Sequence, residues 1–341
     1  MFESGLLAKR SRLRGILFSV LGYAVSLGCL IWVFTGVNWR NLGVELIHAS
    51  LGWLIIAAFW GIGAQIYHAW RWNLLLRPVS RLKLWRTARA LYIGLFANEV
   101  LPLRPGELIR SYLLAAWNQM AFSVAVSSVA LERLLDAFSL TVAFSMTMAF
   151  LSLPPYLITG MRLLAGFLVL ASFLLLIFLW RMRGGARPPG RFTGRLRPAM
   201  EGIRRMANAR TLAASVIASL VQLALFGFPF WALSKACRLN LSVWAVIAVL
   251  IIVRVATIIP NTPGNAGVLQ AACVLALGLL GIDKTRATAY AALLFVVATL
   301  PILIAGAAVV AITGVKIREL LRGTAELATV DSPVASESGG C

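Results

Sequence analysis

Two stretches of this sequence decide its fold: residues 90–117, ALYIGLFANEVLPLRPGELIRSYLLAAW, and residues 245–281, AVIAVLIIVRVATIIPNTPGNAGVLQAACVLALGLLG. In each, two short apolar runs flank a break of the form P-x-x-P-G, which begins at Pro102 and at Pro260. A helix that crosses a bilayer needs about 20 apolar residues, and proline interrupts a helix. Both stretches are therefore predicted to be broken helices that enter and leave the membrane on the same side.

Six longer apolar runs surround these breaks. They cover residues 15–36, 51–70, 124–152, 160–180, 211–234 and 286–315. Apolar residues make up 60% of the chain and mean hydropathy is +0.86, whereas soluble domains average about 45–50%. A soluble helix that is apolar all round for this length is unusual. The sequence thus predicts an all-α integral membrane protein with about six full spans and two re-entrant broken helices.

The net charge of +20 lies mainly in the connectors between apolar runs. Four regions hold 22 of the 32 lysines and arginines: the N-terminus 1–14, the connectors 71–89 and 181–210, and the segment 316–341. The positive-inside rule places all four in the cytoplasm of a bacterial inner-membrane protein, with both termini inside. The connector 71–89 in this assignment begins with Arg71. The segment 316–341 is predicted to be a largely disordered tail, and the scattered charge argues against a nucleic-acid partner.

The two breaks lie 158 residues apart. The same shift carries the run 51–70 onto 211–234 and the run 124–152 onto 286–315, within a few residues. This register predicts two membrane repeats, residues 15–152 and 153–315, which have inverted orientations. Inverted repeats with broken helices are a transporter architecture in which the substrate binds at the breaks. The alternative is two proline-kinked spans without a functional break.

Eight ionisable residues remain at membrane depth in this topology. They are Arg104, Arg110, Arg133, Arg254, Glu99, Glu107, Glu132 and Asp136. Each costs about 2.5–3.5 kcal/mol at the centre of a membrane helix, so their presence indicates a function. Equal numbers of acids and arginines predict mutual pairing, in which an acid of the segment ALERLLDAF (130–138) meets a nearby arginine. Ion pairs that serve structure alone are the alternative.

The first break predicts an anion site. A half-helix that begins after Pro105 has unpaired N–H groups and a dipole that favour phosphate, and Arg104 and Arg110 flank this terminus. Guanidinium groups bind phosphate bidentately, and polar side chains at the second break offer neutral hydrogen bonds. The predicted substrate-binding residues are Arg104, Gly106, Glu107, Arg110, Glu132, Arg133, Asp136, Asn261 and Asn265, with Glu99 and Arg254 as secondary candidates.

The sequence has no pattern typical of metal binding, cysteine pairing or the catalytic motifs considered below. His48 and His68 are isolated and lack metal-ligand spacing, so they are interpreted as interfacial or packed residues. The four cysteines have neither pairing nor metal spacing. No G-x-S-x-G, Walker A or H-E-x-x-H motif occurs. We therefore expect no metal, no cofactor and no catalytic activity.

Three motifs carry a family resemblance. LPLRPGELIRSYLL (101–114), SVAVSSVALERLLD (123–136) and TPGNAGVLQAA (262–272) resemble the membrane region of lysylphosphatidylglycerol synthases, which is also called the flippase-like domain. The likeness covers about residues 15–315. It implies movement of a lipid between leaflets, but not synthase activity, because the aminoacyl-transferase domain of the bifunctional members has no counterpart here. Asn265 stands where an acidic residue is expected in many relatives.

Together these features predict a lipid flippase or lipid transporter. The predicted partner is a membrane phospholipid or another anionic lipid, whose headgroup binds at mid-membrane. Two alternatives stay open. The same half-helix termini suit a small-anion channel or exchanger, and the chain could instead be a non-catalytic membrane partner of an envelope-lipid enzyme.

Overall fold

The computed structural model describes residues 20–101, 104–150, 193–258 and 262–316, with the single positions 159, 166 and 170. The predicted N-terminal region 1–14, most of the predicted span 160–180, the start of the basic loop 181–210 and nearly all of the predicted tail lie outside these residues. Asn261 also lies outside them. Within the described ranges every regular element is helical.

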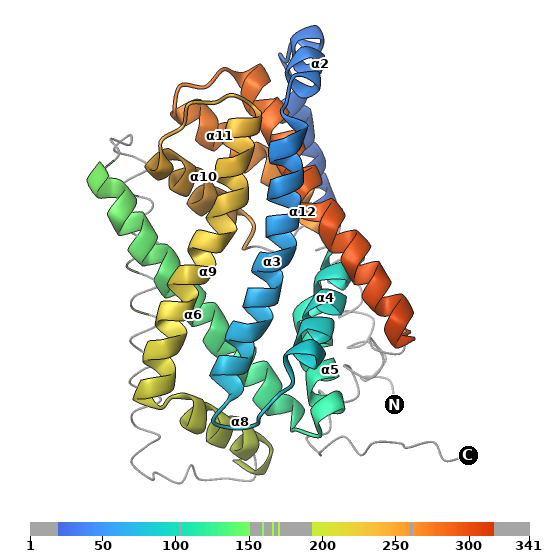
Figure 1. The fold of residues 1–341 in the computed structure, drawn as a ribbon, viewed down its shortest axis with the longest axis vertical. Helices are drawn as coiled ribbons and strands as arrows, with labels where there is room; N and C mark the ends of the chain where they lie inside the picture. Colours follow the sequence, from blue (N-terminus) through green and yellow to red (C-terminus); the bar gives the residue numbers. More distant parts are fainter. Residues whose placement is uncertain are drawn as a thin grey trace, which may run out of the picture.

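A first helix, Val20–Phe34, precedes the labelled elements of Figure 1. The others follow in this order: α2 (Trp39–Ile47), α3 (Leu51–Leu76), α4 (Leu84–Val100), α5 (Gly106–Asn118), α6 (Phe122–Phe150), α8 (Thr193–Met206), α9 (Ala209–Ala236), α10 (Val243–Ala256), the 3-10 turn η1 (Pro263–Asn265), α11 (Val268–Leu279) and α12 (Lys284–Thr313).

Three of these helices, α3, α9 and α12, are long and apolar enough to cross a membrane. They coincide with the predicted spans 51–70, 211–234 and 286–315. The first helix and α2 provide a fourth candidate if they count as one span, although they meet at 91°. The predicted span 124–152 coincides with α6, whose 29 residues include three charged side chains. The chain is therefore an all-helical, multi-pass membrane protein.

Both predicted breaks interrupt helices. The first separates α4 from α5, and the second separates α10 from α11. In each case the two short helices pack against one another, so neither stretch is one continuous helix. In Figure 1 the α10–α11 pair lies in the upper part of the molecule, whereas α4 and α5 lie in its lower half. The prediction of two broken helices is confirmed.

Two glycines bring α4 and α5 into backbone contact. A Cβ atom added at Gly94 would lie 2.6 Å from the carbonyl oxygen of Gly106, and one added at Gly106 would overlap the carbonyl oxygen of Gly94. Only glycine allows so close an approach of two helices. The P-x-x-P-G motif thus ends one helix, and its glycine then lets the next helix pack against the first.

Two segments differ from the sequence-based assignment. Helix α3 continues to Leu76, so Arg71 is a buried helical residue and not part of a cytoplasmic connector. Residues 193–206, within the predicted basic loop, form α8, which lies across the lower end of the molecule in Figure 1 and packs on α6.

Candidate functional site

The carboxylate of Glu132 is the centre of a buried polar cluster. Glu132 lies on α6 with 1% of its surface exposed. Arg71 Nη2 donates to Glu132 Oε1 at 2.7 Å, and Arg110 Nη2 donates to Oε2 at 3.0 Å. His68 contacts Oε1 through its Nε2 atom. Helices α3 and α5 therefore direct two cations and a histidine to one carboxylate of α6.

Asp136, one helical turn after Glu132, extends this cluster toward the surface. Its Oδ1 atom lies 2.8 Å from Arg71 Nη1, which also donates to Ser219 of α9 at 2.6 Å. Its Oδ2 atom lies 3.6 Å from Arg133 Nη1, and Arg133 in turn pairs with Glu107 of α5. The Arg133 and Glu107 side chains are 52% and 42% exposed, so the network runs from a buried inner end to an accessible outer end.

The pairing expected from the charge count is confirmed. Glu132 pairs with Arg110, and Asp136 pairs with Arg133. A buried charge is tolerated when an opposite charge and hydrogen bonds compensate it. The inner group holds Arg71 and Arg110 against two carboxylates, so its formal charges balance when the histidine is neutral.

Arg110 is nevertheless not fully satisfied. Its side chain is 3% exposed, and its guanidinium lies over the Trp72 ring, 4.6 Å from the centroid. Among the residues that the structure describes, its Nε and Nη1 atoms have no hydrogen-bond acceptor, and the same holds for Arg71 Nε. A buried donor without a partner costs about 1–3 kcal/mol, and more when it is charged. These N–H groups are suited to an anionic ligand.

The two breaks contact each other at a second polar position. Arg104 Nη1 donates to Asn265 Oδ1 at 2.5 Å, so the structure brings these two predicted residues together. Both have positive φ angles, 51° and 54°, and the neighbouring Gly264 has a φ of 66°. Such conformations are uncommon in residues other than glycine and concentrate at functional sites.

In the first turn of α5, one backbone N–H group already has a hydrogen-bond partner within the protein. The N–H group of Gly106 donates to Asn98 Oδ1 at 2.7 Å, so the unpaired N–H group expected there has a partner. The carboxylate of Glu107 faces Arg133. Anion binding at this break therefore depends on the arginines more than on the helix terminus.

Arg254 lies beside the network without an ion pair to it in the described part of the chain. Its guanidinium lies 4.4 Å from the centroid of the Phe226 ring, and this ring meets the His68 ring edge-on at 6.2 Å. Arg254 also interacts electrostatically with Asp136. It belongs to the surroundings of the network.

Sequence reasoning missed two members of the inner cluster, Arg71 and His68. His68 had been interpreted as an isolated residue, but it contacts the carboxylate of Glu132. The available signal was their spacing, because residues at i and i+3 share one face of a helix. His68 already lies in the apolar run 51–70, and extension of α3 beyond that run would have placed Arg71 on the same helix face at membrane depth.

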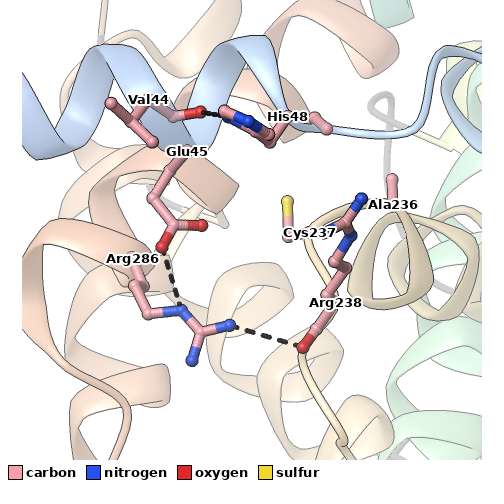
Figure 2. A pocket seen from close by; sticks show the side chains of 8 residues that line it. Val44, Glu45, His48, Ala236, Cys237, Arg238 and Arg286 are labelled. Atoms are coloured by element: carbon pink, nitrogen blue, oxygen red, sulfur yellow. Dashed lines mark hydrogen bonds and ion pairs between the residues drawn. The ribbon is translucent and has the colours of Figure 1, made fainter.

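A separate cavity of about 230 Å³ lies away from this network. It is lined by Val44, Glu45, His48, Ala49, Ala236, Cys237, Arg238 and Arg286. Figure 2 shows the Arg286 guanidinium between the Glu45 carboxylate and the carbonyl oxygen of Arg238, at 3.4 Å and 3.3 Å. None of the predicted substrate-binding residues lines this cavity.

Comparison with protein families supports the resemblance seen in the motifs. The family model of the lysylphosphatidylglycerol synthase TM region matches residues 19–306, a range that contains both breaks and the whole ion-pair network. A comparison with curated proteins found none that matches. Since the family match covers most of the 341 residues, the chain belongs to the lysylphosphatidylglycerol synthase TM region family.

Proposed function

We propose that this protein is a lipid flippase or transporter that binds the anionic headgroup of a lipid at Arg110 and moves the lipid between the leaflets of a bacterial inner membrane. The observation that carries the proposal is the Arg110 guanidinium, which is buried, balanced by Glu132 on one side, and left with two donors that lack acceptors among the described residues. A phosphate oxygen supplies the missing acceptor. The acyl chains stay in the bilayer.

The ion-pair network supports this role through its shape. Its outer pair, Arg133 and Glu107, is exposed, whereas Glu132 and Arg71 are buried. A headgroup that enters from the outer end meets one charged group after another, so it always has a polar partner on its way through the hydrocarbon region. Buried polar groups without a partner call for an explanation, and a bound anion is one that the charge of these donors favours.

The proposed mechanism uses an inverted repeat. The first break enters from the cytoplasmic side, the second enters from the opposite side, and both termini lie in the cytoplasm. The hydrogen bond between Arg104 and Asn265 supports the pairing of the two breaks. Alternating access then consists of a rocking of one repeat against the other around this junction. We propose transport without catalysis.

The experiment is leaflet exchange of fluorescent phosphatidylglycerol and phosphatidylcholine in proteoliposomes. Loss of a charged hydrogen bond costs about 1.5–3 kcal/mol, so we expect Arg110→Met to slow exchange of the anionic lipid roughly tenfold to a hundredfold. Arg110→Lys keeps the charge but loses the planar guanidinium, so its loss should be partial. Arg89→Met is the matched control, because Arg89 also lies over a tryptophan ring, that of Trp85, but is outside the network.

Folding of each variant is checked by size-exclusion chromatography. Wild-type exchange by a monodisperse Arg110→Met protein would overturn the proposal. Chloride or phosphate flux without lipid exchange would identify a small-anion channel instead. Copurification with an envelope-lipid enzyme, in the absence of either flux, would indicate the partner role.

A further inference from the structure

Glu99 lies at the junction of the two breaks, near the end of α4. A Cβ atom added at Gly264 of η1 would lie 2.6 Å from Glu99 Oε2, so this carboxylate oxygen faces the backbone of the second break directly. Thr299 of α12 also lies near the Glu99 side chain and interacts with it. The Glu99 carboxylate, which belongs to the first repeat of the proposed transporter, therefore lies against two elements of the second.

The other acids at membrane depth differ from Glu99 in one respect. Glu107, Glu132 and Asp136 each pair with an arginine within 4 Å. In the part of the chain that the structure describes, Glu99 has no ion pair, and its Oε2 atom is buried without a hydrogen-bond partner. An ionised oxygen in such a position is costly. Protonation of that oxygen removes the charge.

The charged groups around Glu99 are few. Arg104, in the first break, acts on it electrostatically, and Arg104 in turn interacts with Glu107 of α5 and Arg133 of α6. His68 and Arg71 of α3 and Arg110 of α5 contact Glu132, as described above. On the side of η1 and α12, the neighbouring polar groups are the neutral side chains of Asn265 and Thr299. The state of Glu99 thus mainly alters the charge balance of Arg104.

We propose that Glu99 is a proton-binding site that couples lipid movement to the proton gradient. The step is the addition of one proton to the carboxylate to give the neutral carboxylic acid, and its later release. Ionised Glu99 attracts Arg104 and holds it at the junction of the breaks. Neutral Glu99 releases the Arg104 guanidinium to the anionic headgroup, so proton and lipid bind cooperatively and each raises the affinity for the other.

This inference rests on the proposed lipid transport. The test imposes a pH gradient on proteoliposomes and records both translocation of labelled phosphatidylglycerol and the internal pH. In the wild type, reversal of the gradient should change the direction of net lipid movement, and an imposed lipid gradient should drive proton flux. Glu99→Gln mimics the protonated side chain, so it should retain lipid exchange but lose both responses. Glu99→Asp keeps a titratable group and should retain them in part.

Glu201→Gln is the matched control, because Glu201 is an exposed acid on α8 that pairs with Arg205. A response to the pH gradient in Glu99→Gln equal to that of the wild type would overturn the inference. Wild-type lipid exchange that does not respond to the pH gradient, or that follows a sodium gradient, would also overturn the inference. These results leave the transport proposal standing, whereas absence of lipid exchange under every gradient refutes transport itself.

A second readout does not depend on transport. Infrared difference spectra between high and low pH should contain the carbonyl band of a buried carboxylic acid, and Glu99→Gln should remove that band. If the band is absent from the wild type, or persists in a folded Glu99→Gln protein, Glu99 does not bind the proton.

Discussion

The stability of the inner cluster is expected to depend on Glu132 more than on any of its partners. Glu132 accepts from Arg71 and Arg110 and contacts His68, so Glu132→Gln leaves Arg71 with Asp136 as its acid and removes the carboxylate that pairs with Arg110. Removal of one partner from a buried ion pair costs about 3–5 kcal/mol. At about 2 °C per kcal/mol for a chain of this size, the unfolding temperature should fall by roughly 6–10 °C.

Arg110→Met, which removes the arginine of the same ion pair, should lower the free energy of unfolding less than Glu132→Gln does. In Arg110→Met the carboxylate keeps Arg71 and His68, so the loss is that of one charged hydrogen bond, about 1.5–3 kcal/mol. When Arg110→Met is added to Glu132→Gln, the cation that lost its carboxylate partner disappears. The double variant should therefore be more stable than the sum of the single changes predicts, with a coupling energy of about 1–3 kcal/mol.

The assay is thermal unfolding in detergent, followed with a thiol-reactive dye. Cys237 and Cys273 are buried, with 6% and 0% of their surfaces exposed, so they react only when the helices separate. Glu201→Gln should change the unfolding temperature little, because exposed pairs contribute less than about 1 kcal/mol. If the losses for Arg110→Met and Glu132→Gln add to within about 0.5 kcal/mol, the two residues are not energetically coupled and the description of the cluster fails.

Three further predictions follow from the packing, the proposed topology and the strained backbone. Gly106→Ala should cost about 1–3 kcal/mol of unfolding free energy because its Cβ atom overlaps a facing carbonyl oxygen. Gly63→Ala, whose Cβ atom has nothing within 4 Å, should cost almost nothing. Equal values for the two variants would contradict the close helix contact. Arg81→Cys and Arg238→Cys should react with a membrane-impermeant maleimide from opposite faces of the membrane, and labelling from one face would refute the proposed topology. Asn265→Ala should be less stable than Asn265→Gly by about 1–2 kcal/mol, because both variants lose the side-chain hydrogen bond but only alanine is strained at a positive φ. The thiol-dye assay measures this difference. The reverse order of stability would show that the strain is relieved.

The sequence predicted those features that depend on local chemistry or on a charge count. Two prolines followed by a glycine, at residues 102–106 and 260–264, are strong local signals for a helix break, so both breaks were predictable. Acids and arginines at membrane depth must find one another, so pairing between the two kinds of residue followed from their number. Which arginine meets which acid did not follow, because that depends on how the helices pack.

The position of Arg71 could not be predicted from a single sequence. It follows the apolar run 51–70, and a rule that places arginines outside the membrane assigns it to the cytoplasm. The residue remains in the helix because Glu132 and Asp136, more than 60 residues later in the chain, supply its counter-charges. Helix α8 was missed for a related reason. Its arginines indicated a loop, whereas Ala199, Gly202 and Met206, which are buried, form one helical face against neighbouring helices.

The anchoring of the first helix has a consequence for how the protein is made. Lys284 Nζ donates to the carbonyl oxygens of Trp32 and Thr35, across 252 and 249 residues of sequence, and Ser26 shares a hydrogen bond with Thr262. Translation proceeds from the N-terminus, so the first helix emerges from the ribosome long before the residues that hold its end. Until Thr262 and Lys284 have been synthesised, the first helix lacks these hydrogen bonds, so its final position in the bundle is fixed only late in synthesis.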